Sequence, residues 1–190
     1  MSSERLAYQW ARLRAIGWLL LNRHAQAEGV FDQMLERWPQ DGYALASRAH
    51  ARAQLGRRDE AIADMQALVA AHPSRSASDW FNLAYMFEES GRFEDAEAAF
   101  RRSVALGPKL DRAWYGLGLT LSHLQRPDEA VTALQKNTEL QPMSPYGWYQ
   151  LARVQFDRHE PEETRKIIRH LKGFDPKVAK QLERETGLVA

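Results

Sequence analysis

Carboxylate and imidazole side chains are the groups in this sequence best suited to hold a metal ion or to move protons. The most promising set is Glu88, Glu89 and His123, which would meet if their two segments faced one surface. The set lacks two ligands at the three- or four-residue spacing that makes a helical metal motif specific. The chain has no cysteine, which excludes thiolate metal sites and thiol nucleophiles. We therefore expect no metal, no cofactor and no catalytic residue, and hence no enzyme.

A basic run near the C-terminus is the segment most similar to a phosphate-binding surface. Its members are Arg165, Lys166, Arg169, His170 and Lys172. Three glutamates lie beside it, and the whole chain is nearly neutral, with 26 Lys and Arg against 25 Asp and Glu. We interpret the run as a solvated helix face and expect no nucleic-acid partner. Binding of an acidic partner or RNA is the alternative.

Prolines recur along the chain at intervals of 34, 35, 34 and 34 residues. They are Pro39, Pro73, Pro108, Pro142 and Pro176. Twelve residues before each proline is a small side chain: Ala27, Ala61, Ala96, Ala130 and Thr164. Eight before each is a large apolar one: Phe31, Met65, Phe100, Leu134 and Ile168. Twenty-four before each is again a small one: Ala15, Ala49, Ala84, Gly118 and Ala152. This period is typical of stacked structural repeats.

Each period predicts two helices, because apolar residues recur at three- and four-residue steps on either side of a short break. The first helices are predicted near residues 6–21, 43–55, 77–89, 111–124 and 145–157. The second helices are predicted near residues 25–37, 59–71, 93–106, 127–140 and 161–173. The breaks fall at Asn22, Gly56, Gly91, Gln125 to Pro127 and His159 to Pro161. Small residues at helix crossings let the backbones approach, so the pairs should stack in series.

The last three units resemble the tetratricopeptide repeat. Its spacing of large and small residues is carried by Trp80, Leu83, Ala84 and Phe87, by Trp114, Leu117, Gly118 and Leu121, and by Trp148, Leu151 and Ala152. The first two units share the spacing, but Arg14, Arg48 and Arg52 stand where the family usually has apolar residues. The resemblance implies an all-α, right-handed superhelical solenoid of five helix-turn-helix repeats with a C-terminal capping helix.

The resemblance also sets the expected domain organisation. The solenoid would cover residues 1–176, with repeats near 8–41, 42–75, 77–110, 111–144 and 145–176. Residues 177–190 would form the capping helix and tail, because a terminal repeat needs a polar outer face.

A concave groove, lined by a second stripe on each first helix, is the binding surface that the resemblance implies. In the fifth unit the stripe is Tyr146, Tyr149, Arg153 and Phe156, at three- and four-residue steps. The candidate groove residues over all units are His50, Phe81, Asn82, Tyr85, Arg112, Tyr115, Leu119, Tyr146, Tyr149, Arg153 and Phe156. Aromatic rings and arginines suit an amphipathic peptide of a partner protein.

The carboxylate clamp by which some family members grip chaperone C-termini is not reproduced in this sequence. Asn82 and Arg112 fit it, but Ala46, His50 and Gly116 stand at its other positions. We therefore do not expect a receptor for chaperone tails.

The first predicted helix is apolar nearly all round from Ala15 to Leu21, although a terminal repeat should present a polar face. One interpretation is that the N-terminal residues or the turn into the second repeat cover it. The other is that Leu13, Ile16, Leu19 and Leu20 form a docking surface for a partner or for another copy, since large exposed apolar patches are rare on monomers.

Together these patterns predict a non-enzymatic adaptor or scaffold that binds a partner peptide in its groove. The alternatives are a self-assembling structural scaffold and the acidic-partner or RNA binder. The apolar run from Ala15 to Leu21 is much shorter than the roughly 18 residues of a membrane span, and no cleavage pattern follows it. We expect a cytoplasmic protein without membrane insertion. The Ala- and Arg-rich composition suggests a bacterial source.

Overall fold

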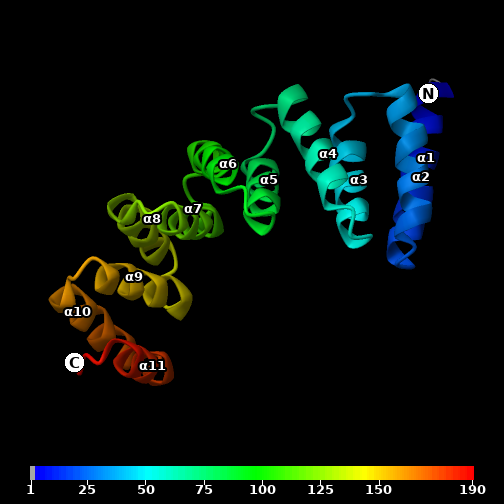
Figure 1. Cartoon of the computed structure of the whole chain (residues 1–190). Coiled ribbons are helices and arrows are strands. Elements are labelled where there is room, and N and C mark those ends of the chain that lie inside the picture. Colours follow the sequence, from blue (N-terminus) through cyan, green and yellow to red (C-terminus); the bar gives the residue numbers. More distant parts are fainter. Residues whose placement is uncertain (1–2) are drawn as a thin grey trace. The chain divides into compact units, whose positions relative to one another are not determined.

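A computed structural model describes residues 3–190, and in that range the chain forms eleven α-helices and no strand (Figure 1). The helices are α1 (Ser3–Leu20), α2 (His24–Arg37), α3 (Gly42–Gln54), α4 (Arg58–Ala71), α5 (Ala77–Glu89), α6 (Phe93–Leu106), α7 (Asp111–His123), α8 (Pro127–Leu140), α9 (Pro145–Asp157), α10 (Pro161–Lys172) and α11 (Pro176–Thr186). Every predicted helix is present, and each end lies within three residues of the predicted one. The fold is an all-α helical-repeat solenoid.

The chain divides into two compact units, one ending at Met86 and the other spanning Phe87–Ala190. In the first unit α1 packs against α2, α2 against α3 and α3 against α4. In the second unit each of α6 to α10 packs against the next helix in the chain, and α7 also contacts α9. Helix α11 packs against both α10 and α9. Helices that pack together are thus mostly consecutive in the sequence, as a stack of hairpins requires.

The periodic positions of the sequence form the core. The five small residues that precede the prolines by twelve positions are completely buried, and the five large ones at eight positions are at most 2% exposed. Gly118 shows why size matters at a helix crossing: a Cβ atom there would lie 2.6 Å from Cγ of Leu134. The small residues therefore let the helices of a hairpin approach, and the large ones fill the adjoining space.

All five hairpin turns have the same backbone geometry. The second residue after each first helix is left-handed, namely Asn22, Gly56, Gly91, Gln125 and His159, with φ between 54° and 77°. The next amide donates to the carbonyl five residues back, as in Arg92 N to Phe87 O at 2.9 Å and Glu160 N to Gln155 O at 3.0 Å. This is the Schellman motif, which satisfies the last carbonyls of a helix.

Three tryptophans join successive hairpins by the same hydrogen bond. The indole nitrogen donates to the carbonyl oxygen of the periodic proline before it, from Trp80 to Pro73 at 2.8 Å, from Trp114 to Pro108 at 2.9 Å and from Trp148 to Pro142 at 2.8 Å. Each bond fixes the start of a first helix against the end of the preceding second helix, so it orients one hairpin on the next.

Candidate functional site

The predicted groove residues of α7 and α9 come together around a hollow of about 280 Å³ in the second unit. Arg112 and Tyr115 line it from α7, and Tyr146 lines it from the first turn of α9. Tyr146 is 71% exposed, so its ring stands in water at the rim. An exposed aromatic ring beside an arginine offers apolar area and directed charge to a ligand.

Asn137 of α8 forms the wall of this hollow between α7 and α9. Its side chain is buried, and its Nδ2 atom donates to the carbonyl oxygen of Asp111 at 2.9 Å. Gly147 is needed opposite it, because any Cβ atom at that position would collide with the Asn137 amide oxygen. The start of α7 is therefore tied to α8, and α9 fits closely over the same amide.

Tyr149 and Arg153, both predicted as groove residues, contact Glu185 of the C-terminal helix α11. The Tyr149 hydroxyl donates to Glu185 at 2.8 Å, and Arg153 donates to the same hydroxyl at 3.3 Å. Gln181 also lies 3.5 Å from that hydroxyl. The hydrogen bonds from Gln181 and Tyr149 lower the pKa of Glu185, which stays ionised. Helix α11 thus covers part of the predicted binding stripe of the fifth repeat.

The other predicted groove residues lie apart from this hollow. Phe81 and Tyr85 stack at 6.4 Å in the first unit, where Tyr85 and Asn82 are exposed. His50 is exposed, with its ring 6.1 Å from that of His24. Leu119 is half-buried on α7. Phe156 lines a separate hollow of about 400 Å³ at the α9–α10 turn. The predicted set therefore forms local groups, and the α7–α9 group brings three of the predicted residues around one hollow.

Sequence reasoning missed the residues that complete these contacts. Asn137, Gln141 and Ser144 line the α7–α9 hollow from α8 and the loop after it. Glu185 lies in α11, outside the five periods, so no repeat position predicts it. Only the polar residue at position 137 in an otherwise apolar helix face was a usable signal.

A larger hollow, of about 590 Å³, lies between α8, α9 and α10. It is built from residues of the packing face, including Trp148, whose ring lies 4.3 Å from that of His170. Its charged rim is already paired, because Lys166 binds Glu163 at 2.6 Å. We regard it as a gap between second helices rather than as the main site.

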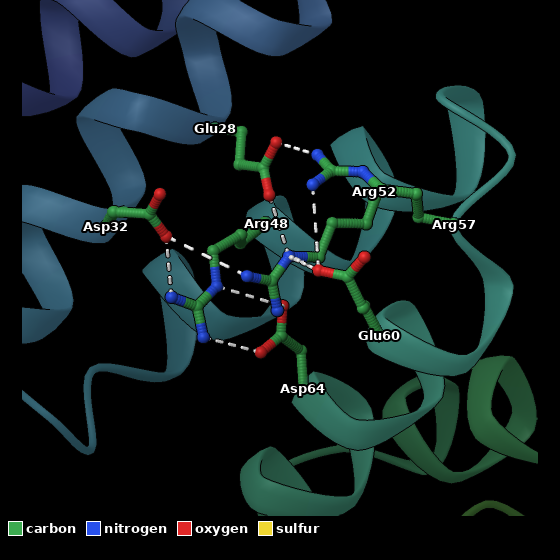
Figure 2. Close-up of polar contacts among 7 residues, drawn as sticks. All are labelled: Glu28, Asp32, Arg48, Arg52, Arg57, Glu60 and Asp64. Atoms are coloured by element: carbon green, nitrogen blue, oxygen red, sulfur yellow. Dashed lines mark hydrogen bonds and ion pairs between the residues drawn. The ribbon is translucent and has the colours of Figure 1, made fainter.

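Arg48 and Arg52 lie in a cluster of seven charged residues between α2, α3 and α4 (Figure 2). Arg48 donates to Asp64 at 2.6 Å and to Asp32 at 2.8 Å. Arg52 donates to Asp64 at 2.9 Å and to Glu28 at 2.9 Å. The hydrogen bond to Asp64 is the main cause that raises the pKa of Arg48 above its ordinary value.

The cluster explains how arginines fit where the repeat pattern is apolar. Asp64 and Glu28 are buried, and Arg57 pairs with Glu28 at the open end, where Glu60 also lies. Every carboxylate of the cluster has an arginine partner. The cluster is therefore a structural ion-pair network and offers no carboxylate for chemistry.

The predicted metal-site candidates do not converge. His123 stacks on Phe93 with ring centroids 4.5 Å apart. Burial, and secondarily the charge of Glu89, raises the pKa of Glu88 to about 6. Within residues 3–190 no group of three His, Asp or Glu side chains is arranged to hold a metal ion.

The basic run of α10 is largely neutralised by neighbouring carboxylates. Arg165 pairs with Glu162 at 2.5 Å, Lys166 with Glu163, and Lys172 with Glu183 at 2.8 Å. These pairs agree with the interpretation of a solvated helix face.

The predicted docking residues of α1 remain largely uncovered. Leu13 is 59% exposed, Leu20 80% and Ile16 38%, whereas Leu19 is half-buried. Among the described residues no helix has both the length and the apolar character needed to cross a membrane.

Comparison with known proteins identifies the repeat. The tetratricopeptide-repeat family is matched over residues 46–111 and again over residues 111–142, together about half of the chain. No curated protein shows significant similarity to the sequence.

Solved structures share the fold at low sequence identity. A MamA protein is 16% identical, with 96% of each chain covered and a TM-score of 0.82. A repeat protein from Parabacteroides merdae is 18% identical, with 96% of this chain and 74% of that chain covered and a TM-score of 0.82. YrrB, described as a repeat protein with an unusual peptide-binding site, is 16% identical, with 90% and 88% covered and a TM-score of 0.80.

Proposed function

Because this chain belongs to the tetratricopeptide-repeat family, we propose that it is a non-enzymatic adaptor that holds a peptide segment of another protein on the face formed by α7 and α9. A protein-interaction role is the general role of this fold. Peptide binding at this particular face is the further step, and it is supported by the side chains around the α7–α9 hollow. YrrB provides a precedent for peptide binding on the same fold, without identifying any residue here.

The exposed ring of Tyr146 beside Arg112 is the observation that carries the proposal. A tyrosine that is 71% exposed makes little contribution to folding, yet it stands at the rim of a hollow with a second tyrosine inside it. Tyrosine and arginine are among the residues that most often dominate binding energy at protein interfaces. The two side chains line the same hollow, so one ligand can contact both.

The shape of the hollow indicates the kind of segment that would fit. Its volume of about 280 Å³ accommodates one large side chain of the ligand, not a whole helix. Arg112 can donate to a carboxylate or a backbone carbonyl of the ligand, while Tyr115 and Tyr146 contact apolar groups. We expect an amphipathic peptide with one anchoring side chain and an affinity in the micromolar range, about −8 kcal/mol.

The bonds between α9 and α11 limit the extent of this face. A ligand reaching past Tyr149 would meet Glu185, whose negative charge is fixed there by two neighbouring side chains. We therefore expect the bound segment to lie over the first turn of α9, and its acidic residues to lie near Arg112 rather than near Glu185.

The proposal is tested by selecting peptides from a displayed random library on the intact chain and measuring their affinities by fluorescence polarisation. Tyr146→Ala and Arg112→Ala should each weaken the selected peptides at least tenfold, since each removes a contact worth roughly 1.4 kcal/mol. Arg102→Ala, at an exposed position on α6, removes the same type of side chain away from the hollow. It is the matched control and should change affinity less than twofold.

Two results would reject this assignment. One is a set of selected peptides that bind the doubly substituted chain as tightly as the original. The other is a loss of helical circular dichroism in the variants, which would mean that the two side chains support the fold and not the ligand.

A further inference from the structure

The outward side of α1 carries a regular row of side chains that no other described element covers. Its members, called here the outer stripe, are Leu6, Trp10, Leu13, Gly17 and Leu20. Their spacings of four, three, four and three residues place them in one line along the helix. Leu6 is 43% exposed, Trp10 67%, Leu13 59% and Leu20 80%. This alternation of three and four is the pattern by which one helix packs along another.

Gly17 indicates how closely another helix can approach. A glycine inside a helix is unfavourable relative to alanine. A Cβ atom at Gly17 would have no neighbour within 4 Å, so the fold of the single chain gives no steric reason for glycine there. Its position within the outer stripe leaves a shallow depression between Leu13 and Leu20, into which a large side chain of another helix fits.

The outer stripe is complementary to itself when it is reversed. With Leu13 placed against Leu13 of a second, antiparallel copy, Leu6 of each copy meets Leu20 of the other. Trp10, the largest side chain of the stripe, then lies beside Gly17, the smallest. A large side chain over a glycine and matched leucines on either side give close packing over the full length of the stripe.

We propose that α1 is a self-docking helix: the outer stripe of one copy packs antiparallel on the outer stripe of a second copy, with a two-fold axis at Leu13. A closed two-fold pair uses the same surface on both copies and leaves no stripe uncovered. The proposal goes beyond peptide binding, because it concerns the first unit and needs no other protein.

The size of the contact sets its strength. The stripe from Leu6 to Leu20 is about 21 Å long, and two helices in contact over that length bury roughly 800 Å² in total. That area belongs to weak, reversible interfaces. We therefore expect a monomer–dimer equilibrium with a Kd of about 10–100 μM.

Arg14 gives the equilibrium a distinctive response to salt. It is exposed and follows Leu13, so the two copies bring their Arg14 side chains close to the axis. Salt screens this repulsion, and association should strengthen when the salt concentration rises from about 50 to about 500 mM. Binding of the same helix to an anionic lipid surface through its arginines would weaken over that range.

Cysteine cross-linking tests the register directly, since the chain has no cysteine of its own. Leu13→Cys should form a disulfide-linked dimer under mild oxidation. Leu6→Cys alone should not, but a mixture of Leu6→Cys and Leu20→Cys should form the mixed dimer. Self-linking of Leu6→Cys as fast as that of Leu13→Cys would overturn the antiparallel register, and failure of all three would overturn the contact.

Sedimentation equilibrium of the intact chain tests the interface without cross-links. Leu13→Glu and Leu13→Lys should each be monomeric at about 500 μM, and an equimolar mixture should recover the dimer because opposite charges meet on the axis. Gly17→Leu should raise Kd at least tenfold without lowering Tm, since its side chain enters open space in the monomer.

Two further results would overturn the proposal. One is that the unsubstituted protein stays monomeric at about 500 μM. The other is binding to phosphatidylserine vesicles that Leu13→Glu abolishes while the free protein shows no dimer, which would assign the outer stripe to a lipid surface.

Discussion

Arg48 and Arg52 occupy positions that face neighbouring helices in a stacked repeat, and their charges are compensated by buried carboxylates. Asp64 is 4% exposed and accepts hydrogen bonds from both arginines. The arginines are spaced i to i+4 on α3, and the carboxylates are spaced in the same way on α2 and α4. One i to i+4 pair of arginines with an i to i+4 pair of carboxylates on each neighbouring helix is therefore the sequence signal that identifies such a network.

Asp64→Asn should lower the free energy of unfolding by about 3 kcal/mol, because it leaves two partly buried arginines without their shared charge partner. Urea denaturation followed by circular dichroism measures the change. Asp32→Asn is the matched control, since that side chain is 45% exposed and its loss should cost less than about 1 kcal/mol. Equal effects of the two substitutions would contradict the buried-network interpretation.

Glu88 gives the chain a predicted pH dependence. Burial raises its folded pKa to about 6, above the 4.5 of a free glutamate, so the folded state holds the proton more tightly than the unfolded one. The stability that this difference provides is complete below about pH 4.5 and is lost as the pH rises to about 6.

Glu88→Gln should therefore raise the free energy of unfolding by about 1 kcal/mol at pH 7 and leave it unchanged at pH 4. The value allows for the half-exposed side chain, which water screens. Thermal unfolding at both pH values measures the effect, with Glu94→Gln, exposed on α6, as the control. A gain of the same size at pH 4 would exclude titration of Glu88 as the cause.

At this scale the sequence predicts packing better than polar contacts. Ala96 and Phe100 could be assigned to the core because they recur with the period of the repeat, and both are fully buried. The bond from Tyr149 to Glu185 could not be predicted, since it depends on where α11 turns back onto α9. A residue that recurs with the repeat has a similar packing environment in every repeat, but the period does not show which side chain it hydrogen-bonds to.

In two of the hairpin turns the residue type does not suit the backbone conformation that it adopts. Asn22, Gly56 and Gly91 suit the left-handed conformation, but Gln125 and His159 adopt it at φ values of 57° and 60°. A side chain other than glycine or asparagine is unfavourable there by roughly 1–2 kcal/mol. The last two turns therefore form because the helices on either side pack together.

Gln125→Gly and His159→Gly should each stabilise the chain by about 0.5–1 kcal/mol, because relief of the left-handed strain exceeds the added entropy of the unfolded state. The reverse change, Gly56→Gln, should destabilise it by a similar amount. Urea midpoints measure all three. A loss of stability in both glycine variants would mean that the native side chains make contacts that outweigh the strain.

Many helix boundaries were predictable because they are marked locally. Pro127, Pro145, Pro161 and Pro176 each begin a helix, and a left-handed residue follows each first helix. The length of α1 was less predictable, since Ser3 to Arg5 extend it beyond the apolar pattern by which it was recognised.

At the scale of the whole molecule, the two proposed surfaces lie in different compact units. The outer stripe belongs to α1 in the first unit, and the α7–α9 hollow belongs to the second. The grouping of residues 1–176 into one solenoid domain stays a prediction. Because the two surfaces share no residue, a substitution can alter one of them while the other is kept.

This separation predicts that each of two substitutions changes one property and leaves the other unchanged. Leu13→Glu should abolish the concentration dependence of the mass and change the affinity for selected peptides less than twofold. Tyr146→Ala should weaken peptide binding at least tenfold and leave the monomer–dimer equilibrium unchanged. Sedimentation equilibrium and fluorescence polarisation on the same samples measure both. A variant that changes both properties would show that one surface serves both roles.

The indole-to-proline bonds described above occur at three of the junctions between hairpins, at Trp80, Trp114 and Trp148, each with the same partner type. A segment of 34 residues therefore contains a complete hairpin together with the means of attaching it to the preceding one. In-frame duplication or loss of a coding segment of that length would create a junction of the same kind as those already present. A gene of this type can therefore gain or lose whole hairpins without evolving a new kind of contact between them.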